Sequence, residues 1–333
     1  MRSPHRLFPL AALILLASGA APIPKHAAAH SATPRPAGSH PAPYRSVEVR
    51  VRTRDGQTLA GTLTLPAARG KRPAMLLLSS ADATDRDASN MHGLYHPFGQ
   101  IADTLSRHGI AVLRLDDRGV GRSTGRLDTL NTAERANDAR DALAFLRARP
   151  EIDRRRVGLL GHSEGGLIAM MLAAEDTSLH AVVLMAATAH AGRQVVEWQE
   201  RYAVAKGSVV PALRSRLVNE AMVDWEKRLA KDRWAAFFDR YDPLMTARKV
   251  RAAVLILQGN ADTSCPPAEA DALGSALRSA GNSEVAVQHL EGLDHAFLHL
   301  RDFENGVAHG DASFLLSSDV LARIVNWAVP RLH

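Results

Sequence analysis

Cysteine is almost absent from this sequence of 333 residues, which contains only Cys265. A single cysteine excludes an internal disulfide, so a hydrophobic core must hold the folded chain together. With 46% hydrophobic residues, the chain can bury such a core in one large domain or two modest ones. We expect Cys265 to be a packed thiol. Because the sequence also lacks a cluster of Cys and His ligands, we expect no metal and no organic cofactor.

Dense runs of one charge are also scarce. The 41 basic residues are spread along the chain among 35 acidic ones, and the one compact basic run, at 154–156, follows acidic residues. The net charge of +6 therefore indicates a basic, soluble surface, and we expect no nucleic-acid partner.

The first 44 residues differ in composition from the rest. Residues 1–21 combine a basic start, an apolar stretch at 7–17 and small residues at 18–20, which is typical of a secretory signal peptide. The stretch is too short to span a membrane. Residues 22–44 are rich in Pro, Ala and His and predict a disordered linker. We expect a periplasmic or secreted protein with no stable membrane anchor after cleavage, and an uncleaved anchor is the alternative.

Residues 45–333 have the pattern of an α/β domain. Alternating residues at 47–65, with a turn at Asp55 and Gly56, predict a hairpin. Short apolar runs then predict strands at 74–78, 110–115, 157–160, 181–185, 253–257 and 285–290. Longer runs between and after them predict helices at 98–108, from 131, at 167–174, at 267–280 and at 318–329. Such alternation indicates a mostly parallel sheet covered by helices on both faces.

Residues 188–248 interrupt this alternation. They contain no good strand, and they hold seven of the sixteen Phe, Tyr and Trp residues of the chain. We interpret the segment as a helical lid that lines a pocket. The alternative is an ordinary helical subdomain whose aromatic side chains pack only its own core.

Residues 161–166, Gly-His-Ser-Glu-Gly-Gly, lie between a predicted strand and a predicted helix. This G-x-S-x-G context is typical of a nucleophile elbow, in which a tight turn pushes the Ser163 hydroxyl out of the sheet. Side chains two residues on either side would clash, which explains Gly161 and Gly165. The alternative is a glycine-rich turn with a surface serine.

Two later residues complete a candidate constellation. Asp262 follows the strand at 253–257, and His295 follows the strand at 285–290. Functional groups gather at the carboxyl ends of parallel strands, so both are expected beside Ser163. His295 would take the serine proton and Asp262 would orient the imidazole. Asp294 is a rival acid, although a neighbour in sequence is badly placed to reach the His295 ring.

With these motifs the chain resembles the α/β-hydrolase superfamily, and in particular bacterial secreted esterases grouped with serine aminopeptidase-like and prolyl-oligopeptidase-like hydrolases. The resemblance spans about residues 47–330 and rests on 85–87, 115–125, 161–166, 258–262 and 292–297. It implies an α/β-hydrolase fold with a helical lid at 188–248, and catalytic Ser163, Asp262 and His295.

The resemblance also implies an oxyanion hole built from two backbone N–H groups. One belongs to Glu164 and the other to Ala81, with Ser80 as second choice. Relatives have a glycine-rich stretch where this chain has residues 80–83, and Asp82 either brings negative charge near the hole or points to solvent. We expect Arg118 to bond the carbonyls and acids that brace this loop.

These features predict a serine hydrolase that cleaves small-molecule carboxylic esters through an acyl-serine intermediate. One alternative is amide or peptide hydrolysis, with acids of the insertion receiving an amine. The other is a catalytically inactive hydrolase fold that binds a ligand. The sequence sets no oligomeric state.

Overall fold

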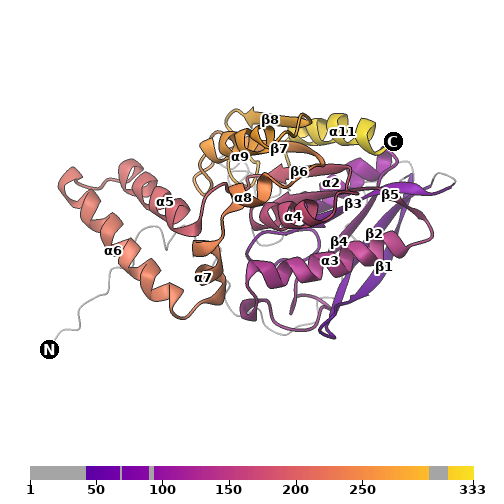
Figure 1. The fold of residues 1–333 in the computed structure, drawn as a ribbon, viewed down its shortest axis with the longest axis horizontal. Coiled ribbons are helices and arrows are strands. Elements are labelled where there is room, and N and C mark those ends of the chain that lie inside the picture. Colours follow the sequence, from indigo (N-terminus) through magenta and orange to yellow (C-terminus); the bar gives the residue numbers. More distant parts are fainter. Residues whose placement is uncertain (1–42, 68–69, 90–93, 300–313) are drawn as a thin grey trace.

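The computed structural model describes residues 43–67, 70–89, 94–299 and 314–333 (Figure 1). The predicted signal peptide at 1–21 and all but the last two residues of the predicted linker lie outside these ranges. Within the described ranges, no helix combines the length and the apolar character needed to cross a membrane.

Eight strands form a single sheet in the order β1-β2-β4-β3-β5-β6-β7-β8. The predicted hairpin is confirmed: β1 (Tyr44–Arg52) pairs antiparallel with β2 (Thr58–Pro66), and β2 pairs antiparallel with β4 (Ala111–Leu115). All remaining pairs are parallel. They involve β3 (Arg72–Leu78), β5 (Ile152–His162), β6 (Ala181–Met185), β7 (Ala253–Gly259) and β8 (Val285–Leu290). Their carboxyl ends therefore share one edge of the sheet.

Helices cover both faces, as the alternating pattern predicts. One core layer lies under α3 (Thr132–Ala148), α4 (Glu164–Glu175) and α9 (Ala268–Ser279). The other lies under α2 (Pro97–Arg107) and α11 (Ser318–Leu332). The start of α3 is fixed by a capping box, in which Asn131 and Glu134 each accept from the other's backbone N–H. A short 3-10 turn, η2 (Leu127–Thr129), precedes it.

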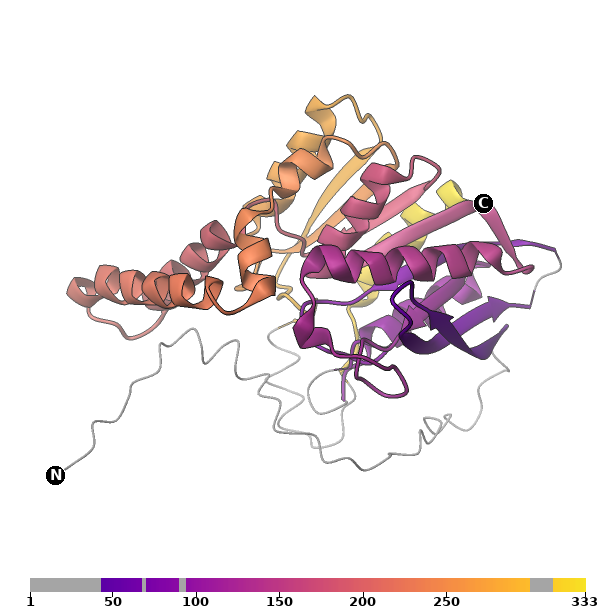
Figure 2. The same ribbon diagram turned by 60° about the horizontal axis from the view of Figure 1, so that its bottom comes forward.

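The segment at 188–248 is helical where it has regular structure. It contains α5 (Gly192–Lys206), α6 (Pro211–Leu229), α7 (Arg233–Arg240) and α8 (Pro243–Ala247). Figures 1 and 2 both show α5 and α6 extending away from the sheet as an arm. By contrast, α7 contacts α3, and α8 contacts α4 and α9. The insertion therefore has a protruding part and a part that rests on the body.

Candidate active site

Ser163 occupies a strained turn between β5 and α4. Its backbone angles are φ 54° and ψ −117°, a region that a residue with a side chain rarely adopts. Its N–H donates to the Met185 carbonyl over 2.8 Å, which ties the turn to β6. A Cβ at Gly161 would lie 2.1 Å from the Gly165 carbonyl oxygen, and one at Gly165 would lie 2.1 Å from the Leu78 oxygen. Both glycines are therefore required by close approach of backbone.

Asp262 and His295 meet at the carboxyl edge of the sheet. The His295 Nδ1–H donates to Asp262 Oδ2 over 2.8 Å. The other oxygen of Asp262 accepts from the backbone N–H groups of Ser264 and Cys265, and Gln258 Nε2 donates to Oδ2 over 2.9 Å. Asp294 instead accepts from the N–H groups of its own loop. The acid that orients the ring is thus Asp262.

This pair shifts the pKa of both groups. Burial alone would lower the pKa of His295, but the Asp262 carboxylate outweighs burial and the net pKa is raised above its usual value. Burial alone would raise the pKa of Asp262, but His295 and the backbone N–H groups of Cys265 and Ser264 hold it below its usual value. The negative charge of Asp82, an exposed residue, also raises the pKa of His295.

His162, which precedes the candidate nucleophile, has a role that the sequence did not reveal. Its Nε2–H donates to the His295 backbone carbonyl over 2.9 Å, and the two rings lie 4.9 Å apart. Burial, followed by repulsion from His295, lowers the pKa of His162 to about 4. The ring is therefore neutral near pH 7, and it fixes the backbone of the loop that carries His295.

The side chain of Glu164 lies at the centre of a second network. It is 4% exposed and accepts from Thr132 Oγ1 and Arg135 Nη1, both in α3, and from Trp234 Nε1 in α7 over 2.9 Å. A carboxylate at the first residue of α4 also faces the positive end of that helix. Glu164 therefore joins the elbow to α3 and to the insertion.

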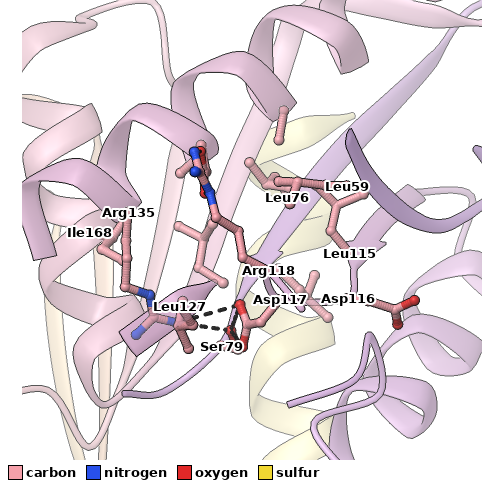
Figure 3. A pocket seen from close by; sticks show the side chains of 15 residues that line it. Leu59, Leu76, Ser79, Leu115, Asp116, Asp117, Arg118, Leu127, Arg135 and Ile168 are labelled. Carbon is pink, nitrogen blue, oxygen red and sulfur yellow. Dashed lines mark hydrogen bonds and ion pairs between the residues drawn. The ribbon is translucent and has the colours of Figure 1, made fainter. Parts of the chain in front are cut away.

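Arg118 does not do what the sequence indicated. It pairs with Asp138 and Asp55, and within the described ranges neither acid forms a hydrogen bond or ion pair with the loop after β3. Arg135 braces that loop instead, by donating to the Ser80 carbonyl over 2.7 Å and pairing with Asp117. Asp117 in turn accepts from Ser79 Oγ, 3.0 Å away, as Figure 3 shows. The difference arises because Arg135 reaches this loop from the first turn of α3, a contact that sequence order does not reveal.

A small cavity of about 50 Å³ lies beneath this cluster, between α3 and the sheet (Figure 3). Ser79, Asp117 and Arg135 contribute to its lining. Binding sites for organic ligands usually enclose about 300–1,000 Å³, so this cavity is too small for a substrate. It belongs to the support of the loop.

The remaining predicted residues also lie at the carboxyl edge of the sheet, but one expected hydrogen bond is missing. Ala81 is exposed on the loop after β3, whose first residue, Ser79, lies close to Gly165 of the elbow. In the part of the chain that the structure describes, no hydrogen bond joins the Ser163 hydroxyl to the His295 ring. The described residues also contain no group of three or more His, Cys, Asp or Glu side chains that could hold a metal.

The insertion touches the site at two places. Trp234 of α7 bonds to Glu164, and Gln199 of α5 donates to the Ser264 carbonyl over 2.6 Å, beside Asp262. Phe237, Phe238 and Tyr241 pack against the main core. These aromatic side chains thus pack α7 against the main domain. Neither the lid interpretation nor the subdomain interpretation predicted this contact.

Comparison with known proteins agrees with this architecture. The family described as "Serine aminopeptidase, S33" matches residues 90–252. Solved structures that superpose on the chain include the Pyrococcus furiosus esterase Pf2001, with TM-score 0.60, 15% identity and coverage of 87% of this chain and 92% of that one. The α/β hydrolase GrgF from a Penicillium species superposes with TM-score 0.57, 19% identity and coverage of 86% and 99%. The fold is that of an α/β hydrolase.

Curated relatives extend the comparison to sequence. The thiohydrolase apmlB of Arthrinium phaeospermum is 34% identical over 140 residues, covering 41% of this chain and 42% of its own. The esterase EstD of Thermotoga maritima is 27% identical over 212 residues, covering 61% and 50%. The matches thus span half or less of the length of these two relatives. The chain therefore has the fold of α/β hydrolases, and part of its sequence resembles an esterase and a thiohydrolase.

Proposed function

We propose that the protein is a serine hydrolase that cleaves small-molecule carboxylic esters through an acyl-serine intermediate. The observation that carries this proposal is the Asp262–His295 hydrogen bond at the sheet edge that also holds the strained Ser163 turn. The names of relatives, an esterase and a thiohydrolase, support the same reaction class.

The proposed chemistry follows from the hydrogen bonds. With Nδ1–H committed to Asp262, the lone pair of His295 Nε2 is free to take the Ser163 proton during attack on the ester carbonyl. His295 then gives this proton to the leaving alcohol, and an acyl-serine remains. Water, activated by the same ring, hydrolyses the acyl group. Catalytic hydrogen bonds often tighten only when substrate binds, so the missing Ser163–His295 bond does not oppose this sequence.

The proposed oxyanion hole consists of the backbone N–H groups of Glu164 and Ala81. Glu164 starts α4, so its N–H lies at the positive end of a helix. Ala81 lies on the loop after β3, which contacts the elbow where the Leu78 and Ser79 carbonyls meet Gly165. Each donor of this kind contributes about 10²–10³-fold to turnover.

The test uses the full chain and its Ser163→Ala variant with p-nitrophenyl acetate, butyrate and octanoate. We expect hydrolysis by the parent and a fall of about 10⁴–10⁶-fold in kcat for the variant. Equal, near-background rates for two folded proteins would overturn the proposal. Labelling of the parent by a fluorophosphonate separates an active serine from an inactive, ligand-binding fold.

Amide or peptide hydrolysis is the second candidate, favoured by the family that matches residues 90–252. An amine would need an unpaired acid near the site, and the candidate acids of the insertion are Glu197, Glu200, Glu220, Asp224 and Glu226. Four of them form ion pairs with basic side chains of α5 or α6, and among described residues only Glu200 does not. An aminoacyl p-nitroanilide turned over faster than the esters would make this second candidate the better one.

We also propose that the protein is exported to the periplasm or secreted, because residues 1–21 have the composition of a signal peptide. The measurement is the N-terminal sequence of the protein recovered from periplasmic and medium fractions. A mature N-terminus shortly after residue 20 is expected, and an intact N-terminus in the membrane fraction would contradict the proposal.

A further inference from the structure

Arg135 contacts three separate segments around the candidate site. Its guanidinium is 6% exposed and bonds to the Glu164 carboxylate in the elbow, to the Ser80 carbonyl in the loop after β3, and to Asp117 in the loop after β4. A buried cation needs this many partners to offset its lost hydration. This role is not visible in the sequence, since Arg135 looks like any polar residue in the first turn of α3.

The bond to Ser80 constrains more than one carbonyl. The Ser80 carbonyl and the Ala81 N–H belong to one peptide group, which is planar and trans, so the two point in opposite directions. Because Arg135 holds the carbonyl toward α3 over 2.7 Å, the Ala81 N–H is directed away from α3. The orientation of one proposed oxyanion donor is therefore set by a side chain that need not touch substrate.

The bond to Glu164 has two consequences for the other donor. It anchors the residue whose own N–H is the second proposed donor. It also places a positive charge against a buried carboxylate that would otherwise repel an oxyanion forming close by. Thr132 and Trp234 donate to the same carboxylate, and Arg135 is its one cationic partner within the described ranges.

We propose that Arg135 is a positioning residue that holds both backbone N–H donors of the oxyanion hole in the orientation needed to bind the oxyanion. The proposal rests on the proposed serine-hydrolase function, since this orientation matters only when Ser163 attacks a carbonyl. The role is specific to the transition state: the substrate ground state does not require these donors, whereas the negatively charged tetrahedral intermediate does.

The chain offers a matched control in Arg118. This guanidinium is also buried, at 8% exposure, and also bonds two acids, Asp138 and Asp55. Among the described residues it forms no hydrogen bond or ion pair with either proposed donor segment. Arg118→Met and Arg135→Met therefore remove the same group from similar surroundings, and only the second should disturb the hole.

The experiment first establishes p-nitrophenyl butyrate hydrolysis by the full-length parent, then compares kcat and KM of Arg135→Met, Arg135→Lys and Arg118→Met. We expect kcat to fall about 10–100-fold in Arg135→Met with KM within about 3-fold, because one or both donors lose alignment. Arg135→Lys keeps the charge but not the fork that reaches three partners, and we expect an intermediate kcat. Arg118→Met should keep kcat within about 3-fold.

Affinity for a trifluoromethyl ketone, which forms an oxyanion on Ser163, supplies a readout that simple loss of stability would not move. We expect it to weaken in Arg135→Met by the same factor as kcat/KM. Equal kinetic losses in Arg135→Met and Arg118→Met, or unchanged ketone affinity, would overturn the positioning role while leaving the hydrolase function intact. If Arg135→Met does not fold, Arg135→Lys against Arg118→Lys decides by the same criteria. A parent without esterase activity or ketone binding would refute the function and this role together.

Discussion

Gly166 offers a sharp test of how the elbow helix packs on the sheet. A Cβ added at this third residue of α4 would lie 2.6 Å from the Ala187 Cβ, just after β6. Its next neighbours are the Gly161 carbonyl oxygen at 3.5 Å and the Ala187 Cα at 3.6 Å, which are ordinary contacts. A single methyl group on Ala187 is therefore the obstacle to a side chain at this position.

The magnitudes predict strong coupling between the two positions. Gly166→Ala gains about 1 kcal/mol of helix propensity, but overpacking destabilises the fold by about 1–3 kcal/mol. Because the new Cβ would lie only 2.6 Å from the Ala187 Cβ, we expect the overpacking cost to be about 3 kcal/mol. Ala187→Gly loses about 0.8 kcal/mol for the methyl group and about 0.5–1 kcal/mol in backbone entropy. In the double variant the new methyl fills the vacated space. We expect its free energy of unfolding to lie within about 1 kcal/mol of the parent.

The assay is urea unfolding of the parent, both single variants and the double variant. Gly165→Ala is the control, because its Cβ would meet the Leu78 and Ser79 carbonyl oxygens at 2.1 and 2.6 Å, which no side-chain change relieves. Ala187→Gly should not rescue it. Additive effects of Gly166→Ala and Ala187→Gly would refute the packing that we describe.

Three further predictions concern charge and the insertion. Because burial lowers the pKa of His162 from 6.5 to about 4, its contribution to stability is complete above pH 6.5 and is lost as the pH falls toward 4. The free energy of unfolding of the parent should therefore drop by about 2 kcal/mol more between pH 7 and pH 5 than that of His162→Asn, and parallel pH profiles would contradict this. Since Asp82 raises the pKa of His295, Asp82→Asn should move the acid limb of kcat/KM to lower pH by a few tenths of a unit, roughly as for an exposed charge pair. If the midpoint of this acid limb stayed in place or moved to higher pH, the effect of Asp82 on His295 would be refuted. Trp234→Phe should lose about 1–2 kcal/mol, because a buried carboxylate loses a donor, and urea unfolding with no change would show that this bond contributes nothing.

The sequence was sufficient for the parts of the fold that local pattern controls. Apolar runs located the strands and helices, Asn131 located the start of α3, and the rule that parallel strands end at one edge brought Asp262 and His295 together. These features depend on residues close in sequence or on the geometry of the sheet. A mostly parallel sheet covered by helices on both faces followed from them, and the resemblance to known families implied the α/β-hydrolase fold.

The supports of the site could not be predicted in the same way. Arg135 reaches Glu164 across 29 residues, and Trp234 reaches it across 70. Such contacts depend on how helices pack in three dimensions, which local sequence pattern does not specify. This is why Arg118 was assigned a brace that Arg135 provides, and why His162 received no role.

The central claim is that Ser163 is a nucleophile activated by His295. Its most direct measurement is the mass of the intact full-length protein, and of the peptide carrying Ser163, after treatment with a fluorophosphonate. We predict one adduct per chain, located on Ser163, and labelling slowed by several orders of magnitude in His295→Asn. No adduct on the folded parent, or an adduct elsewhere that persists in Ser163→Ala, would contradict the account.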